Sequence, residues 1–332
     1  MASPALMAAH GQLQPRVGRF EIGALSRGMD LEAARVALIG VSVGDAFGTM
    51  LDGYGAELAR RAAKRLISMK RPWRWTDDTA MALSIVEVLE QHAAIEVDAL
   101  AAAFARRFAR DPNRGYGAGA HGLLARVHNG ASWRDEATRM FGGKGSFGNG
   151  AAMRAAPIGA AFAPDLERVR DEALRSAEPT HAHPDGAAGA AAVAIAAALA
   201  RAGVAGNALV GEVARWTPEG PTRDGLFRAR ELGVGFDVRA AGEELGTGSN
   251  VTSRDTVPFA VWVAARHAGS YEEALWTACA HPGLELAGNA LGVSAIDRDT
   301  IGAIVGGIVA SATGLDGIPL LWREATEPLH GA

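Results

Sequence analysis

The segment from residue 186 to residue 202, GAAGAAAVAIAAALARA, decides the fold class of this chain. Alanine is the strongest helix former, and its small side chain lets neighbouring helices approach closely. Val193, Ile195 and Leu199 add larger apolar side chains to the same segment. The segment therefore predicts a helix that packs closely against others.

Helical patterns continue on both sides of this segment, whereas β-branched runs with a period of two residues are absent. Further helices are predicted over 31–43, ending at Gly44, over 79–91, 97–110, 166–177 and 255–266, with Pro258 in the first turn of the last, and after a capping box at 270–273. Two short helices are predicted within 217–250, and loops at 115–122, 142–150 and 246–253. The sequence thus predicts an all-α protein with a single compact multi-helix domain over residues 29–325, after a partly disordered leader at 1–28.

The composition narrows the functional class. The 332 residues are 48% hydrophobic and carry a net charge of −4, so there is no electrostatic case for nucleic-acid binding. The single cysteine, Cys279, excludes a disulfide framework and fits a reducing, cytoplasmic setting. The N-terminus lacks the pattern of a signal peptide, and the apolar run 301–313 is too short and too rich in glycine to span a bilayer. We expect no membrane association.

Two acidic clusters lie far apart in the chain, and each opens an apolar, helix-like run. They are Thr76-Asp77-Asp78-Thr79 and Asp297-Arg298-Asp299-Thr300. Either cluster alone is accounted for by helix capping, because Asp and Thr favour helix N-termini. Four carboxylates that converged without cations would repel one another, and oxygen-only ligands suit Mg²⁺, Mn²⁺ or Ca²⁺. The pair of clusters therefore indicates a metal-dependent hydrolase.

Two other segments offer ligand contacts. The glycine-rich stretch 142–150 could cradle phosphate with its backbone N–H groups, or serve only as a flexible connector, and it is not a P-loop. Within it, Phe147 could stack on an adenine ring. In the segment 180–185, a capping turn is the default, but a histidine there could donate to a ligand; it offers too few ligands for zinc.

A carboxylate also lies in the glycine-punctuated helix predicted over 40–48, whose glycines are typical of tight helix–helix packing. Asp45 lies within this apolar stretch and needs a partner, because an unpaired buried carboxylate is costly. Asp52 follows on the next turns and could point into the same cavity.

Five motifs in this order resemble the ADP-ribosylglycohydrolase family, which includes the dinitrogen reductase-activating glycohydrolases. The motifs are Gly-Asp-Ala-Phe-Gly at 44–48, Thr-Asp-Asp-Thr at 76–79, Ser-Phe-Gly-Asn-Gly-Ala-Ala-Met-Arg at 146–154, Thr-His at 180–181 and Asp-Arg-Asp-Thr at 297–300. The resemblance, which extends from about residue 36 to residue 314, implies an all-α catalytic domain that binds two Mg²⁺ or Mn²⁺ ions. The implied metal ligands are Thr76, Asp77, Asp78, Asp297, Asp299 and Thr300.

The resemblance also implies a substrate site and a reaction. The implied substrate-binding residues are Asp45, Ser146, Phe147, Gly148, Asn149, Gly150, Met153, Arg154, His181 and His183, and the implied catalytic residues are Asp52, Asp77 and Asp299. Many relatives carry a glutamate where this chain has Asp52, and a Gly-Gly-Asp-Thr-Asp-Thr motif where it has Arg298 between two aspartates.

The expected reaction is cleavage of the C1″ glycosidic bond of ADP-ribose on a protein side chain, with arginine as the first candidate, or on a small acceptor. Two alternatives remain open: a metal-dependent nucleotide pyrophosphohydrolase, and a non-catalytic ADP-ribose-binding protein on the same scaffold.

Overall fold

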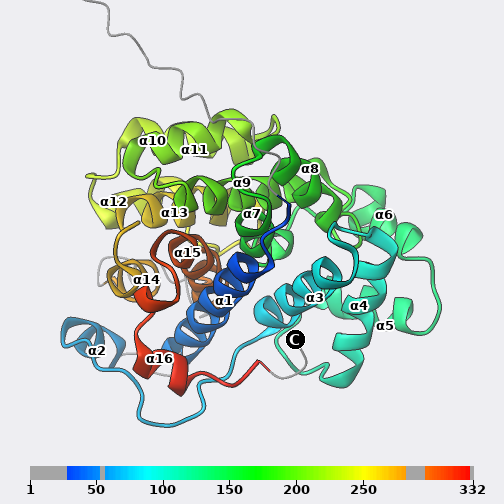
Figure 1. Cartoon of the computed structure of the whole chain (residues 1–332), viewed down its shortest axis with the longest axis horizontal. Coiled ribbons are helices and arrows are strands. Elements are labelled where there is room, and N and C mark those ends of the chain that lie inside the picture. The colour runs from blue at the N-terminus through cyan, green and yellow to red at the C-terminus, as the bar shows by residue number, and fades with distance from the viewer. Residues whose placement is uncertain (1–27, 53–56, 282–295, 330–332) are drawn as a thin grey trace, which may run out of the picture.

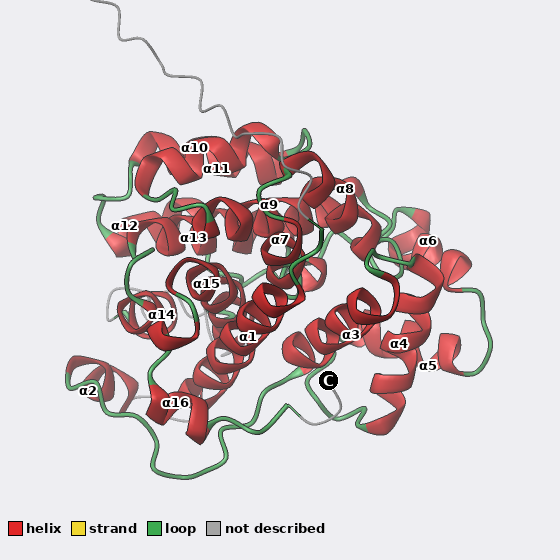
Figure 2. Ribbon diagram, viewed as in Figure 1, coloured by secondary structure: helices red, strands yellow, loops and turns green. Residues whose placement is uncertain are grey.

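The computed structural model describes residues 28–52, 57–281 and 296–329, so the predicted leader lies outside the described residues except for Gly28. Within these ranges every regular element is a helix (Figure 2), and the only strand-like pairings are isolated bridges. The prediction of an all-α fold is confirmed. The α-helices are α1 (Leu31–Asp52), α2 (Leu58–Ala63), α3 (Asp77–His92), α4 (Val97–Arg110), α5 (Ala118–His128), α6 (Trp133–Gly143), α7 (Ala156–Phe162), α8 (Leu166–Ala177), α9 (Pro184–Arg201), α10 (Gly206–Trp216), α11 (Pro221–Leu232), α12 (Val238–Leu245), α13 (Ser253–Arg266), α14 (Tyr271–Ala280), α15 (Arg298–Thr313) and α16 (Leu320–Ala325).

The helices α1 and α15 form the centre of the molecule (Figure 1), and each makes its most extensive contact with the other. The contact is backbone against backbone. A Cβ atom on Gly40 would collide with the carbonyl oxygen of Gly306, and one on Gly44 with that of Gly302. The predicted role of these glycines in tight helix packing is therefore confirmed.

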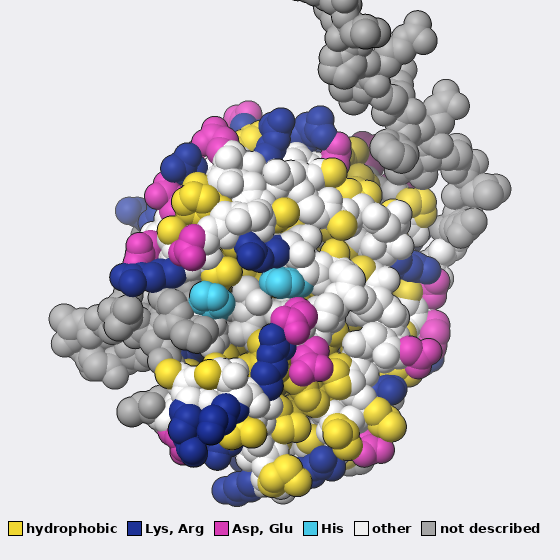
Figure 3. All heavy atoms as spheres, turned by 90° about the vertical axis from the view of Figure 1, so that its left-hand side faces the viewer, with side chains coloured by type: hydrophobic (Ala, Val, Ile, Leu, Met, Phe, Trp, Pro, Cys, Tyr) yellow, Lys and Arg dark blue, Asp and Glu magenta, His cyan; other side chains and the backbone are white. Residues whose placement is uncertain are grey.

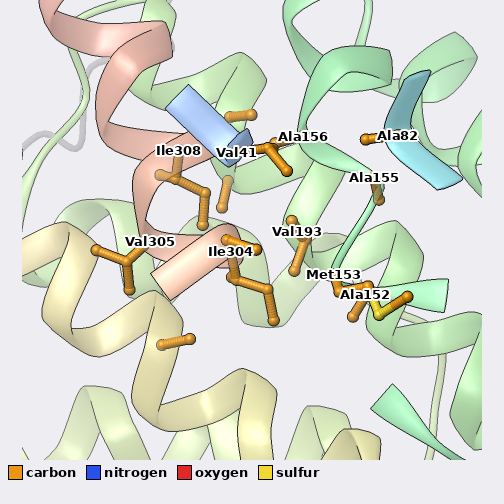
Figure 4. Packing of buried hydrophobic residues seen from close by; sticks show 14 of the residues in the cluster. Val41, Ala82, Ala152, Met153, Ala155, Ala156, Val193, Ile304, Val305 and Ile308 are labelled. Atoms are coloured by element: carbon orange, nitrogen blue, oxygen red, sulfur yellow. The ribbon is translucent and has the colours of Figure 1, made fainter. Parts of the chain in front are cut away.

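The remaining core surrounds this pair. The alanine-rich α9 is buried along almost its whole length and packs against α7, α8, α13 and α15. Figure 4 shows Val41 of α1, Val193 of α9 and Ile304 of α15 meeting in one apolar cluster, and all three are fully buried. The helix predicted from the alanine content of this segment thus lies at the core, where small side chains let several helices share one space.

The surface carries charges of both signs. On the face shown in Figure 3, acidic and basic side chains are interspersed among uncharged groups. By length and composition, α1 could cross a membrane, but 72% of its most apolar window is buried inside the protein. Burial of this extent is typical of a core helix.

Several predicted boundaries hold and others do not. The helices over 97–110 and 166–177 match α4 and α8, and the two helices expected within 217–250 are α11 and α12. The prediction that the first helix ends at Gly44 is wrong, because α1 continues to Asp52 with its glycines against α15. The loop expected at 115–122 is also wrong in part, since α5 begins at Ala118.

One further boundary differs. The helix predicted from Asp255 begins two residues earlier, at Ser253, so Pro258 lies inside the helix and not in its first turn.

We predict that Gly44→Ala destabilises the protein by about 2 kcal/mol or more, because overpacking of a backbone contact outweighs the ~1 kcal/mol of helix propensity that alanine adds. Thermal and urea unfolding would measure the change. Gly269→Ala is the matched control, since nothing lies within 4 Å of a Cβ at that position. Equal stability of the two variants would contradict the role of the α1–α15 contact.

Candidate functional site

One cavity of about 580 Å³ gathers most of the side chains that the sequence singled out. Its wall includes the first turns of α3 and α15 and the glycine-rich loop. The sequence-predicted residues in this wall are Asp77, Asp78, Ser146, Phe147, Gly148, Asn149, Gly150, Met153, Arg154, His181, Asp297, Asp299 and Thr300. The two acidic clusters, more than 200 residues apart in the chain, therefore meet in space.

The acidic clusters reach the cavity because both open helices. Asp77 and Asp78 are the first residues of α3, and Asp297 and Asp299 flank the first residue of α15. Helix N-termini present unpaired N–H groups and the positive end of the helix dipole, which favour carboxylates at these positions. The packing of α15 on α1, and of α1 on α3, brings the two N-termini together.

Asp45 joins the cluster at 76–79 to α1. Its carboxylate is fully buried and accepts hydrogen bonds from the backbone N–H and the hydroxyl of Thr76, and from the same two groups of Thr79 at 3.1 and 2.6 Å. The hydroxyl of Thr76 also lies 3.0 Å from Asp78 Oδ2. Neither Asp45 nor Thr76 lines the cavity, and Asp45 holds the first turn of α3 in place through these hydrogen bonds. Thr79 is a supporting residue that the sequence analysis did not single out.

Burial and mutual repulsion keep these carboxyl groups protonated to unusually high pH. Burial and the charge of Asp299 raise the pKa of Asp45 to about 7 and that of Asp77 to about 8. The pKa values of Asp78 and Asp297 are raised well above their ordinary value, mainly by burial and then by neighbouring aspartates. Among the described residues, no lysine or arginine forms an ion pair with any of these carboxylates.

The cluster has the chemistry of a site for hard cations. Asp78 Oδ1 is buried, and within the described residues it has no hydrogen-bond partner. Divalent ions suit a set of carboxylate and hydroxyl oxygens, and they would replace the protons that these acids otherwise retain. No three His, Cys, Asp or Glu side chains of the described residues already stand in metal-ligand geometry. The donor set of carboxylate and hydroxyl oxygens fits Mg²⁺ or Mn²⁺.

The glycine-rich loop forms another part of the wall. It is tied to the segment 251–253 by hydrogen bonds from Asn149 N to the Val251 carbonyl and from Ser253 N to the Phe147 carbonyl. The side chain of Asn149 donates to Asp297 Oδ2 at 2.7 Å, which joins this loop to the acidic cluster. The loop is thus held in place and is more than a flexible connector.

The cavity also contains an aromatic residue that the sequence analysis missed. Phe141 lies in the left-handed region at a φ of 52°, is 57% exposed, and its ring lies 5.4 Å from that of Phe147. The kink at residues 140–142 turns its ring toward the loop. The only sequence signal for such a kink is that Phe141 directly precedes two glycines. The two rings offer an apolar surface for a flat ligand.

The two candidate histidines occupy different positions. His181 is buried in the cavity wall, and burial and the nearby Arg154 lower its pKa to about 3, so the ring is neutral. His183 is outside the wall; it caps α9 by accepting a hydrogen bond from Asp185 N, and its ring lies 5.6 Å from that of Phe147.

Asp52 is outside the cavity wall and is directed by Arg298. The Arg298 Nε atom lies 3.1 Å from Asp52 Oδ1, while Arg298 Nη1 donates to the Cys279 carbonyl at 2.6 Å. Burial and Asp299 raise the pKa of Asp52 to about 6, against the opposing effect of Arg298. Arg298, which lies between the two late aspartates in the sequence, therefore forms its ion pair with Asp52.

Comparisons with known proteins agree on one family. A family model described as ADP-ribosylglycohydrolase matches residues 28–331. The protein "ADP-ribosylhydrolase ARH3" of Homo sapiens is 32% identical over 290 residues, which cover 76% of this chain and 74% of that protein. The protein of the same name from Danio rerio is 27% identical over 345 residues, covering 92% and 89%.

A solved structure titled "ADP-ribosylglycohydrolase-related protein complex" has the same fold. It matches with a TM-score of 0.60 at 23% identity, over 90% of this chain and 93% of that one.

We predict that, in the presence of a chelator, the free energy of unfolding rises as the pH falls from about 9 to about 7. The pKa of Asp77 is about 8 when folded and about 4 when unfolded, so the folded protein takes up a proton that the unfolded chain does not. The gain from Asp77 alone is of the order of 1 kcal/mol. Asp77→Asn should flatten the dependence, whereas the exposed Asp98→Asn should leave it unchanged. Urea unfolding at several pH values measures this dependence. A free energy of unfolding that falls as the pH is lowered from about 9 to about 7 would contradict the raised pKa of Asp77.

Proposed function

The chain belongs to the ADP-ribosylglycohydrolase family, and we propose that it hydrolyses the bond between C1″ of ADP-ribose and an acceptor. Arginine side chains of ADP-ribosylated proteins are the first acceptor to test, followed by small ADP-ribose conjugates. The observation that carries the proposal is the meeting of four aspartates from two distant clusters in one cavity with a glycine-rich loop and two aromatic rings.

Two Mg²⁺ or Mn²⁺ ions are proposed as cofactors, held by Thr76, Asp77, Asp78, Asp297, Asp299 and Thr300. The support is the unpartnered Asp78 Oδ1 and the absence of basic partners for the cluster within the described residues. When bound, such ions supply Lewis acidity that lowers the pKa of a water molecule.

The protein's own residues would place the substrate. The two phenylalanine rings accept the adenine beside them, and the loop 146–150 and His181 contact the diphosphate. The distal ribose then lies toward the acidic clusters, with C1″ exposed to attack. Confinement in a cavity holds the reacting atoms at a productive separation and removes much of the entropic cost of the encounter.

The bond changes are those of a glycosidic hydrolysis. A new bond forms between the water oxygen and C1″, the bond from C1″ to the acceptor breaks, and the leaving nitrogen takes up a proton. The proton released by water passes to a carboxylate. Asp77 and Asp299, which line the cavity, are the first candidates for this step; Asp52 lies outside the wall, but its raised pKa, about 6, is suited to proton exchange near neutral pH.

The proposed cellular setting is the reducing cytoplasm. Its support is that the single cysteine, Cys279, is a buried free thiol.

We predict that Asp77→Ala and Asp299→Ala each lower the rate of hydrolysis by about a thousandfold, because losing a metal ligand removes several kcal/mol of transition-state stabilisation. The fold should persist, since each change relieves repulsion. Chelation should abolish wild-type activity and Mg²⁺ or Mn²⁺ should restore it. The assay compares arginine-, serine- and nucleic-acid-linked ADP-ribose and separates the products by chromatography.

Asp135→Ala, at an exposed helix start, is the matched control. Full activity of either cluster variant would remove the proposed site. Release of AMP instead of intact ADP-ribose would favour a pyrophosphohydrolase.

We also predict that Phe147→Ala and Phe141→Ala each weaken ADP-ribose binding about tenfold, because stacking on an aromatic ring contributes ~1 kcal/mol beyond the area that it buries. The affinity for ribose 5-phosphate, which lacks adenine, should stay the same. Calorimetry measures both ligands, and Phe236→Ala, an exposed phenylalanine outside the cavity, is the control. Equal loss for both ligands would contradict an adenine contact.

A further inference from the structure

Arg154 is a buried cation without a carboxylate partner. Its side chain is completely inaccessible, and the guanidinium lies 4.3 Å over the ring of Phe104. Within the described residues it forms no ion pair, and its Nε atom has no hydrogen-bond partner. Burial lowers the pKa of Arg154 to about 9, so burying this charge is costly. The nearby charge of Asp77 opposes this shift, and the hydrogen bonds of the guanidinium indicate a positioning role.

Arg154 Nη1 donates to the Met81 sulfur at 3.3 Å in the cavity wall, whereas the hydrogen bonds of Nη2 lead toward a histidine. Arg154 Nη2 donates to the Ser176 carbonyl at 2.9 Å and to Thr180 Oγ1 at 2.8 Å. Thr180 Oγ1 in turn lies 2.7 Å from His181 Nδ1. Arg154 is therefore connected through one hydroxyl group to the neutral ring in the cavity wall.

The direction of each hydrogen bond follows from the groups involved. Arginine can only donate, so the Thr180 oxygen accepts from Arg154 and keeps its own proton to donate. Thr180 is 2% exposed, and among the described residues His181 Nδ1 is the only acceptor within reach of that proton. If Nδ1 carried a proton instead, the threonine proton would be buried without an acceptor, which costs ~1–3 kcal/mol. The Nδ1 atom is thus unprotonated, and the ring proton lies on Nε2.

The Nε2 atom faces the glycine-rich loop. A Cβ atom on Gly148 would lie 3.5 Å from Nε2, and one on Gly150 would lie 3.1 Å from Cε1. On the other side of the ring, a Cβ on Gly186 would lie 3.2 Å from Cδ2. Three glycines therefore surround the imidazole closely, and Nε2 has no hydrogen-bond partner among the described residues.

We propose that Arg154 is a positioning residue: through the Thr180 hydroxyl it holds His181 in the Nε2–H tautomer, which presents a neutral hydrogen-bond donor to a diphosphate oxygen of the substrate. Arg154 then does not bind the substrate itself. The diphosphate part of this inference rests on the proposed function, whereas the tautomer is a property of the protein alone.

The tautomer is tested by ¹⁵N NMR of histidine-labelled protein at neutral pH, with the His181 signals assigned by their loss in His181→Gln. Unbound wild-type protein should show a pyridine-like Nδ1 and a pyrrole-like Nε2. Thr180→Val removes the hydroxyl with little change of shape, so the ring should lose this fixed state. Thr180→Ser keeps the hydroxyl and should restore it. A pyrrole-like Nδ1 in the wild-type protein, or an unchanged spectrum in Thr180→Val, would overturn the inference.

The diphosphate contact is tested by affinity. Thr180→Val should weaken binding of ADP-ribose about tenfold and leave binding of adenosine, which has no phosphate, unchanged; Thr180→Ser should bind as the wild type does. Thr217→Val is the matched control for loss of a buried hydroxyl, since Thr217 is 2% exposed and donates to the Val213 carbonyl outside the cavity. Equal weakening for adenosine would overturn the diphosphate contact. A wild-type protein that binds no ADP-ribose would overturn the proposed function, while the NMR spectra would still decide the tautomer.

Discussion

The contact between the glycines of α1 and α15 is the constraint on which the site depends. Since no side chain separates the two backbones at Gly44 and Gly302, the helices lie as close as helices can. This approach brings the N-terminus of α15 against Gly48 of α1, about one turn from Asp45, which binds the first turn of α3. The same packing that fills the core therefore sets the separation of the two acidic clusters.

The site itself works against stability. Protein interiors exclude unpaired charge, yet here several aspartates share one cavity, and burial together with the charges of neighbouring aspartates raises the pKa values of Asp77 and Asp78. Strain of this kind is typical of functional sites, where the energy is offset by the rest of the fold or by a bound ligand.

Much of this arrangement could be predicted from sequence because it depends on local patterns. The alanine content predicts the buried helix α9. The two acidic clusters, each at the start of an apolar run, predict two helix N-termini that both carry carboxylates. Details that arise from packing could not be predicted. The orientation of the Phe141 ring toward the glycine-rich loop depends on a kink in the left-handed region, and the Asp52–Arg298 ion pair depends on the contact between α1 and α15. Likewise, only the folded chain shows that Arg154 points at Thr180 and not into the cavity's open space.

Gly40 pairs with Gly306 and Gly44 with Gly302, so the two helices pack in an antiparallel orientation with their glycines in register. A slide of one helix along the other by one turn would move the late aspartates by about 5.4 Å relative to Asp45. The intervening chain can therefore gain or lose length in its loops without changing the distance between the two carboxylate groups. In this fold, the glycines of α1 and α15, which have no side chains, fix the distance between the two acidic clusters.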